Sequence, residues 1–186
     1  MHRAAEHTGR GMSRITALAA GALVVLAPVL AGCGPSPAPT PTPTAAFASE
    51  EEAFAEAEKV YREYVDALNA RNAGDADPDP QEYLVGQALE GDIDTQRNLE
   101  SEGLALRGAI ELRTFIIDVA ELKNRDTTVV ATACLDISDA RLIGSDGSDV
   151  TPAGRPDLVA QEVTLEGARK RLAITLESEG DVSRCD

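Results

Sequence analysis

Residues 110–122 read IELRTFIIDVAEL, residues 124–126 read NRD, and residues 127–136 read TTVVATACLD. Along the first run, side chains alternate between two sets, which are Ile110, Leu112, Thr114 and Ile116, and Glu111, Arg113, Phe115 and Ile117. A period of two places the two sets on opposite faces of a strand. The two runs therefore predict a pair of long, twisted strands joined by a tight turn.

Three further strands are predicted after this pair, at residues 140–143, 158–165 and 171–177. The turn sequence SDGS (145–148) closes the first of them, and EGAR (166–169) forms the hairpin between the other two. Residues 182–185 form the terminal segment of the chain. The strands follow one another without intervening helices, which predicts a meandering antiparallel sheet.

Helices precede the strands. Ser49 with Glu52 is a capping box, and Gly74 suits the left-handed cap at the other end of a helix that runs to about Ala70. Apolar or aromatic residues recur between them at helical spacing, at Phe54, Ala57, Tyr61, Tyr64 or Val65, and Leu68. We expect the two tyrosines to pack in the core with their hydroxyls at its edge; a ligand-facing role for one of them is the alternative.

A second helix is predicted to start at Asp79 with Pro80 in its first position, and to run to about Glu90. Gly91 interrupts it, and a third short helix covers residues 93–99 and ends near residue 103. The fold class is therefore α+β, with N-terminal helices packed on a curved antiparallel sheet.

The start of the chain is typical of an exported protein. Arg3, Arg10 and Arg14 precede an apolar segment at residues 15–30, which is too short for a stable membrane span. Residues 30–33 then read LAGC. This tetrapeptide resembles a bacterial lipobox, which implies cleavage before Cys33 and lipid on its thiol. The alternative is an ordinary signal peptide cut at an Ala-x-Ala site. Lipidation would hold the protein at the extracytoplasmic face of the cell membrane.

We divide the chain into a signal peptide (1–32), a lipidated cysteine with a stalk (33–48) and one α+β domain (49–186). The stalk sequence GPSPAPTPTPT at residues 34–44 favours extended polyproline II, because alternating proline fixes φ and removes amide donors. The domain at residues 49–186 is long enough to build a single hydrophobic core.

Charge and histidine content exclude several function classes. The chain has 17 basic and 32 acidic residues; the signal peptide holds three of the arginines and Glu6, which leaves 14 basic and 31 acidic residues. Such a surface disfavours nucleic acid as a partner. Both histidines, His2 and His7, lie in the signal peptide, so the mature chain has no Ser-His-Asp or Cys-His catalytic set and lacks the usual nitrogen ligand of zinc or copper.

Two cysteines remain once Cys33 carries lipid. In an exported protein, Cys134 and Cys185 are expected to form one intramolecular disulfide, which would stabilise the fold by up to about 4 kcal/mol. Two buried free thiols or an intermolecular bridge are the alternatives.

Several segments carry a resemblance to known proteins: the lipobox and stalk, the helix 50–69, residues 83–108, TACLD at 132–136 and SRC at 183–185. On these segments the chain resembles lipoproteins of unknown function from high-GC Gram-positive bacteria, with a domain similar to the nuclear-transport-factor-2-like superfamily. The resemblance implies the cone-shaped α+β fold shared with ketosteroid isomerase and scytalone dehydratase. Related sequences often have a tryptophan in the last hairpin, and this chain has none.

Only one internal acid stands out as a candidate catalytic group. Asp118 lies among Ile116, Ile117, Val119 and Ala120, and an enclosed carboxyl there would have a raised pKa and could act as a general base. The alternative places it at the rim or on the wet face of the sheet. Asp136, Asp139, Asp146 and Asp149 flank loops, but lack the spacing of a calcium loop, so ordinary turns are expected. We predict no metal and no cofactor.

The leading hypothesis is a non-enzymatic, membrane-anchored binding or accessory lipoprotein, whose partner is another envelope protein or an apolar ligand in the cone. The alternative is a small-molecule isomerase or dehydratase that uses a carboxylate and a tyrosine in the cone cavity. A homodimer formed through the sheet is compatible with both. The direction in which Asp118 and the three tyrosines point distinguishes the two hypotheses.

Overall fold

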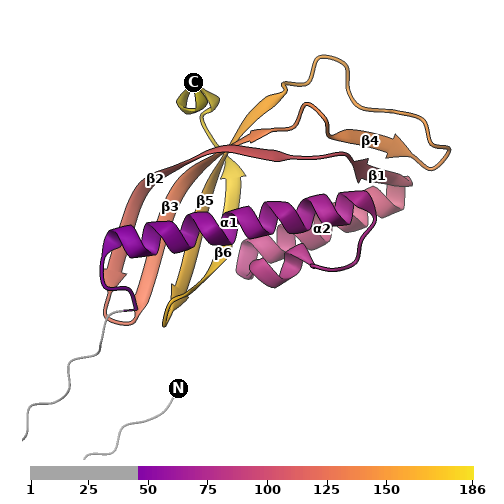
Figure 1. Cartoon of the computed structure of the whole chain (residues 1–186). Coiled ribbons are helices and arrows are strands. Elements are labelled where there is room, and N and C mark those ends of the chain that lie inside the picture. The colour runs from indigo at the N-terminus through magenta and orange to yellow at the C-terminus, as the bar shows by residue number, and fades with distance from the viewer. Residues whose placement is uncertain (1–45) are drawn as a thin grey trace, which may run out of the picture. The chain divides into compact units, whose positions relative to one another are not determined.

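The computed structural model describes residues 46–186 (Figure 1). The predicted signal peptide (1–32), the lipidation residue Cys33 and the stalk up to residue 45 lie outside the described residues. Ala46 and Phe47 are already buried in the core, so packing begins before the helix cap at Ser49. Among residues 46–186, none of the helices combines the length and the apolar character needed to cross a membrane.

A four-stranded antiparallel sheet has the order β2–β3–β5–β6. Its strands are β2 Glu111–Lys123, β3 Asp126–Asp136, β5 Leu158–Ala168 and β6 Arg171–Glu179. The predicted strands are confirmed, with ends that differ by up to three residues. The last hairpin turns at Arg169 and Lys170, which both have positive φ, so its turn lies at the end of the predicted 166–169 segment.

A second sheet pairs β1 Leu104–Arg107 with β4 Arg141–Gly144. β4 was predicted from the sequence, whereas β1 was not. Gly108 follows β1 with a φ of 85°, and a Cβ there would lie 2.1 Å from the carbonyl oxygen of Asp139. Only glycine permits this close approach of two backbones, which turns the chain from β1 into β2.

Helix α1, Glu50–Ala73, follows the predicted signals at both ends. The Ser49 side chain accepts a hydrogen bond from the amide of Glu52, and Gly74 caps the other end with a φ of 99°. The side chain of Asn69 then makes two hydrogen bonds of 2.8 Å with the backbone of Ile110, one as donor and one as acceptor. These bonds fix the start of β2 against α1, and Figure 1 shows the sheet bending around this helix.

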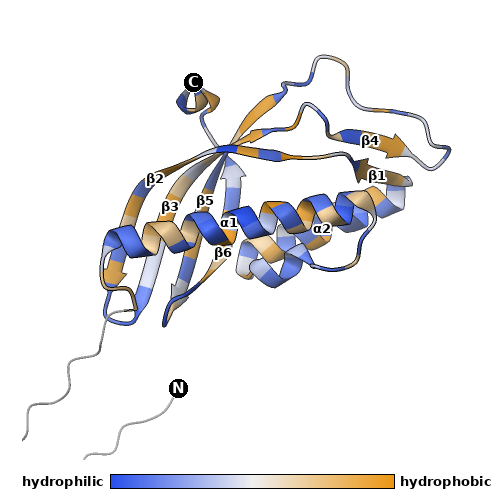
Figure 2. Cartoon of the chain, viewed as in Figure 1, coloured by the Kyte–Doolittle hydropathy of each residue, from blue (hydrophilic) through white to orange (hydrophobic). Residues whose placement is uncertain are grey.

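The prediction of two helices divided at Gly91 is wrong. Asp79 caps a short 3-10 helix, η1 Pro80–Tyr83, and one continuous helix, α2 Gly86–Glu102, follows. The chain is extended between them because Leu84 is buried and bridges to Ile174 of β6. Figure 2 shows mainly polar residues along α2, and Ala88 is the buried residue of this helix.

The core lies between α1 and one face of the four-stranded sheet. The chain ends on the opposite face in η2, Val182–Cys185, which the disulfide between Cys134 and Cys185 ties to β3. The predicted intramolecular disulfide is therefore confirmed. We call the helix-covered side of the sheet the inner face and the side that carries η2 the outer face (Figure 1).

Candidate functional site

A cavity of about 460 Å³ lies between α1, α2 and the inner face of the sheet. Part of its lining is apolar, and comes from Leu68, Leu99, Leu106, Ile110 and Leu135. The polar part includes Tyr61, Tyr64, Arg71, Asp92 and Glu177. Cavities of about 300–1,000 Å³ that combine apolar walls with a few convergent polar groups are typical of small-molecule sites.

Glu177 of β6 is the central polar group of this cavity. The hydroxyl of Tyr61 donates to Glu177 Oε1 at 3.1 Å, and the hydroxyl of Tyr64 donates to Oε2 at 3.0 Å. Removal from water raises the pKa of the Glu177 carboxyl, and the two hydrogen bonds oppose that rise in part. Burial also raises the pKa of both tyrosines, so each remains a hydroxyl donor.

A β-bulge explains why Glu177 faces inward. In β6, Leu172 and Ile174 are buried in the core, so simple alternation would place Leu176 inside and Glu177 outside. The pairing with β5 shifts by one residue between Ile174 and Leu176, because Thr175 is extra. Leu176 is therefore exposed and Glu177 points to the inner face. Bulges redirect side chains in this way, and they occur often beside functional sites.

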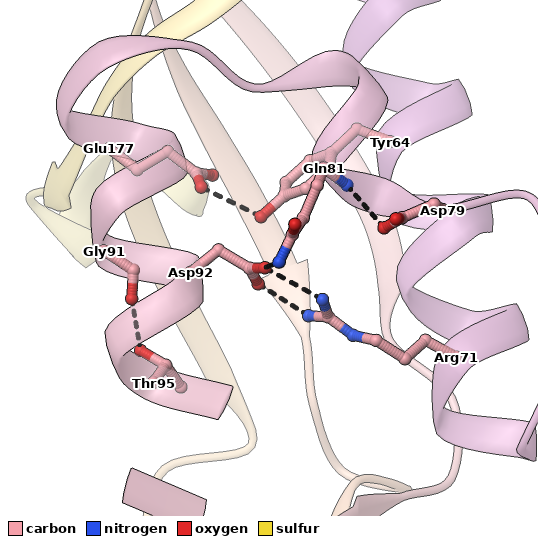
Figure 3. Close-up of polar contacts among 8 residues, drawn as sticks. All are labelled: Tyr64, Arg71, Asp79, Gln81, Gly91, Asp92, Thr95 and Glu177. Carbon is pink, nitrogen blue, oxygen red and sulfur yellow. Dashed lines mark hydrogen bonds and ion pairs between the residues drawn. The ribbon is translucent and has the colours of Figure 1, made fainter. Parts of the chain in front are cut away.

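An ion pair between the helices forms another part of the cavity lining. Arg71 of α1 donates to both carboxylate oxygens of Asp92 in α2, at 3.0 and 2.7 Å. The side-chain amide of Gln81 donates to the same carboxylate at 3.0 Å, and the Asp92 side chain is only 8% exposed. Figure 3 shows this cluster beside the Tyr64–Glu177 hydrogen bond. The charge of Arg71 is therefore neutralised by Asp92, within the same cavity.

Asp118, the catalytic candidate from the sequence, lies on the outer face. It is the extra residue of a bulge in β2, and its Oδ1 is 2.5 Å from a guanidinium nitrogen of Arg184 in η2. Thr132 of β3 donates to its Oδ2 at 3.1 Å and accepts from Arg184 at 2.6 Å. The hydrogen bond from Arg184 lowers the pKa of Asp118. Of the two interpretations of Asp118, the structure therefore agrees with the carboxyl on the wet face of the sheet, and the enclosed general base with a raised pKa is wrong because a cation reaches this carboxylate.

The sequence and the structure thus assign different residues to the candidate site. Tyr61 and Tyr64 are core residues, as predicted, but their hydroxyls meet at Glu177, which the sequence did not indicate. Asp118 is separated from them by the sheet. Arg71 and Asp92 were not indicated either, because their contact depends on how α1 and α2 pack. No local sequence signal marks Glu177, Arg71 or Asp92 as part of a site.

The loop acids form ordinary turns. Asp136 and Asp146 each accept a hydrogen bond from the backbone of a serine two residues later, and Asp149 accepts one from Thr151. Asp136 also pairs with Arg113. Within residues 46–186, no three acidic or cysteine side chains come together as a metal-ligand set.

No protein-family model matches the chain, and no curated protein matches it. Among solved structures, it is similar to the intermembrane space region of the chloroplast protein ARC6, with a TM-score of 0.45 and 18% identity. That match covers 66% of this chain and 92% of the other. A likeness this distant does not bear on function.

Proposed function

We propose that this chain is a membrane-anchored lipoprotein whose domain is a non-enzymatic binding module for a small, mainly apolar ligand. The observation that carries the proposal is the inner-face cavity, whose apolar walls surround the Glu177 carboxylate. Each carboxylate oxygen has acceptor capacity beyond the one hydrogen bond it receives from a tyrosine. A ligand that offers a hydrogen-bond donor next to an apolar body complements such a cavity.

The hydrogen bonds favour binding over catalysis. Both tyrosine hydroxyls direct their protons to Glu177, so neither is free to stabilise a negative charge that develops on a substrate. The mature chain also has no histidine to move a proton. The Glu177 carboxylate therefore offers an acceptor to a ligand, while the two acidic hydroxyls nearest to it are already committed to that carboxylate.

A second candidate function, a small-molecule isomerase, is favoured by one observation. The raised pKa of Glu177, in a cavity with tyrosines, is typical of a general base. Glu177 would take a proton from a carbon next to a carbonyl group and return it to another carbon of the same substrate. The test is whether carbon-bound protons of a carbonyl compound exchange with solvent deuterium in the presence of the protein. This function predicts exchange that is lost in Glu177→Gln. If carbonyl compounds bind in the cavity and their protons do not exchange, the function is contradicted.

The anchor belongs to the same proposal. The LAGC sequence and the proline–threonine stalk support lipidation of Cys33, a position at the extracytoplasmic face of the cell membrane and a domain held away from the bilayer. We also propose that the domain has the cone shape of the nuclear-transport-factor-2-like superfamily, with the cavity inside the cone. Cys33→Ser is expected to release the protein or to leave the precursor uncleaved; a processed, membrane-bound variant would contradict lipidation.

The binding function is tested by blocking the cavity. Thr95 of α2 is exposed and lines the cavity, whereas Asn98 of the same helix is exposed and does not. We expect phenethyl alcohol to perturb the NMR signals of cavity residues in the full chain, with Thr95→Trp weakening its binding and Asn98→Trp leaving it unchanged. Equal binding in the two variants would contradict a site in this cavity.

A further inference from the structure

The charges around the cavity are not balanced. Its lining contains two carboxylates, Asp92 and Glu177, and one cation, Arg71. Arg71 gives both of its forked hydrogen bonds to Asp92. Among residues 46–186, no lysine or arginine forms an ion pair with Glu177, whose two hydrogen-bond donors are neutral tyrosines. The ionised Glu177 is therefore a partly desolvated negative charge without a cationic partner.

The surroundings of Glu177 suit a cation with an apolar body. Tyr61 and Tyr64 belong to the cavity lining, but they are almost fully buried, at 1% and 5% exposed, and their hydroxyls meet the carboxylate. The carboxylate is therefore the group that meets the charged end of a ligand, and the apolar wall accepts a hydrocarbon body. The formal charge of the whole chain, −15, also favours the approach of cations over anions.

We infer that the cavity binds a small organic ammonium, whose nitrogen donates to Glu177 and whose apolar part lies against the leucine-lined wall. This inference rests on the proposed binding function and names the chemical class of its ligand. An ammonium supplies the missing positive charge and forms a charge-assisted hydrogen bond. A neutral alcohol supplies a donor without the charge, and a carboxylate ligand would be repelled by Glu177.

Three probes with the same aromatic body separate these cases: phenethylammonium, phenethyl alcohol and phenylacetate. Their affinities for the full chain are measured by NMR titration at about pH 8, where the amine is protonated. We expect phenethylammonium to bind about tenfold or more tightly than the alcohol, as hydrogen bonds to charged groups exceed neutral ones. Phenylacetate is expected to bind most weakly of the three.

Two variants locate the charge that recognises the ammonium. Glu177→Gln keeps the size of the side chain and its acceptor oxygen, and is expected to abolish the preference for phenethylammonium while the alcohol still binds. Glu179→Gln removes the same charge from an exposed position on the same strand, outside the cavity lining, and is expected to retain the preference. Circular dichroism of both variants checks that the fold is intact.

The possible results distinguish failure of this inference from failure of the proposed binding function. Equal affinity of the full chain for the ammonium and the alcohol overturns the inference that the ligand is an organic cation. The proposed binding function is not contradicted by that result. A preference that survives Glu177→Gln also overturns the inference, because the charge is then elsewhere. If none of the three probes binds in the cavity, the binding function itself fails, and the inference fails with it.

Discussion

Glu177 and Asp118 are carboxylates of one sheet that point to opposite faces of it. Glu177 lies on the inner face, under two helices, and receives hydrogen bonds from two neutral tyrosines. Asp118 lies on the outer face and is paired with the Arg184 guanidinium. The pKa is raised at Glu177 by desolvation and lowered at Asp118 by Arg184. The partner and the access of water, rather than the residue type, set the chemistry of each carboxylate.

The surroundings of the two carboxylates also differ in how they are held. We call Asp118, Thr132 and Arg184 the outer cluster, and Glu177, Tyr61 and Tyr64 the inner cluster. The outer cluster depends on η2, a short C-terminal segment that the Cys134–Cys185 disulfide keeps on β3. The inner cluster joins residues of long elements, α1 and β6, that pack in the core. We therefore expect changes on the outer face to alter stability and leave the cavity intact, whereas changes on the inner face alter the cavity itself.

Removal of the disulfide should have the largest effect. We expect Cys134→Ala with Cys185→Ala to lower the free energy of unfolding by about 2–5 kcal/mol, because the unfolded chain loses a constraint between distant residues. The two cysteines are 51 positions apart. Urea unfolding measures the loss. In the same variant, the pKa of Asp118 should return toward its ordinary value while that of Glu177 stays raised; a parallel change in both would show that the clusters are not independent.

Removal of one tyrosine hydroxyl should come next. Tyr64→Phe leaves Glu177 Oε2 without its donor, and we expect a loss of about 1–3 kcal/mol in the free energy of unfolding, since a desolvated acceptor is left unsatisfied. The matched change on the outer face is Thr132→Val, which takes a donor from Asp118. It should cost less than Tyr64→Phe, because Arg184 still pairs with this more accessible carboxylate. Equal losses in urea unfolding would contradict the difference between the faces.

Loss of the outer ion pair should have a small effect. Arg184 is 38% exposed, and we expect Arg184→Gln to lower the free energy of unfolding by about 1 kcal/mol or less. Its clearer effect is on Asp118, whose pKa should rise. Arg97→Gln, an exposed arginine on α2 with an exposed aspartate partner, is the control for loss of a surface charge. A loss far above that of the control would mean that η2 is held chiefly by this pair.

The pH dependence of stability should differ in sign between the two carboxyls. The pKa of Glu177 is raised in the folded chain, so its stabilising contribution is complete below its ordinary value of 4.5 and is lost as the pH rises through the folded pKa. The pKa of Asp118 is lowered, so its contribution is present above 3.8 and is lost as the pH falls through the folded pKa.

Two isosteric variants check these signs by thermal unfolding across pH. Glu177→Gln should remove part of the fall in stability above about pH 4.5, and Asp118→Asn should remove part of the fall below about pH 3.8. Identical pH profiles for the two variants would contradict the assignment of opposite pKa shifts.

Much of the fold was predictable because its signals are local. Ser49 and Gly74 mark the ends of α1, and the two strand-forming runs on either side of residues 124–126 mark β2 and β3. The division of the second helix at Gly91 failed for a tertiary reason. Leu84 is drawn into a bridge with Ile174, so the break comes earlier, and α2 then runs through a glycine that costs a helix about 1 kcal/mol.

The directions of the two carboxylates, Glu177 and Asp118, were not predictable, because they depend on bulges. Alternation along β6 assigns Leu176 to the core and Glu177 to solvent, and the extra residue Thr175 reverses both. Asp118 is itself the extra residue of a bulge in β2, so its apolar neighbours in sequence do not enclose it. The position of a bulge follows from strand pairing, which the sequence of one strand does not contain.

The central claim is that Glu177 is a desolvated carboxyl facing a cavity while Asp118 is a paired, solvent-accessible one. NMR titration of the side-chain carboxyl carbons in the full chain tests it directly. We expect the midpoint of Glu177 to lie above 4.5 and that of Asp118 below 3.8. Midpoints at the ordinary values for both groups, or a midpoint of Glu177 below 4.5, would contradict the account.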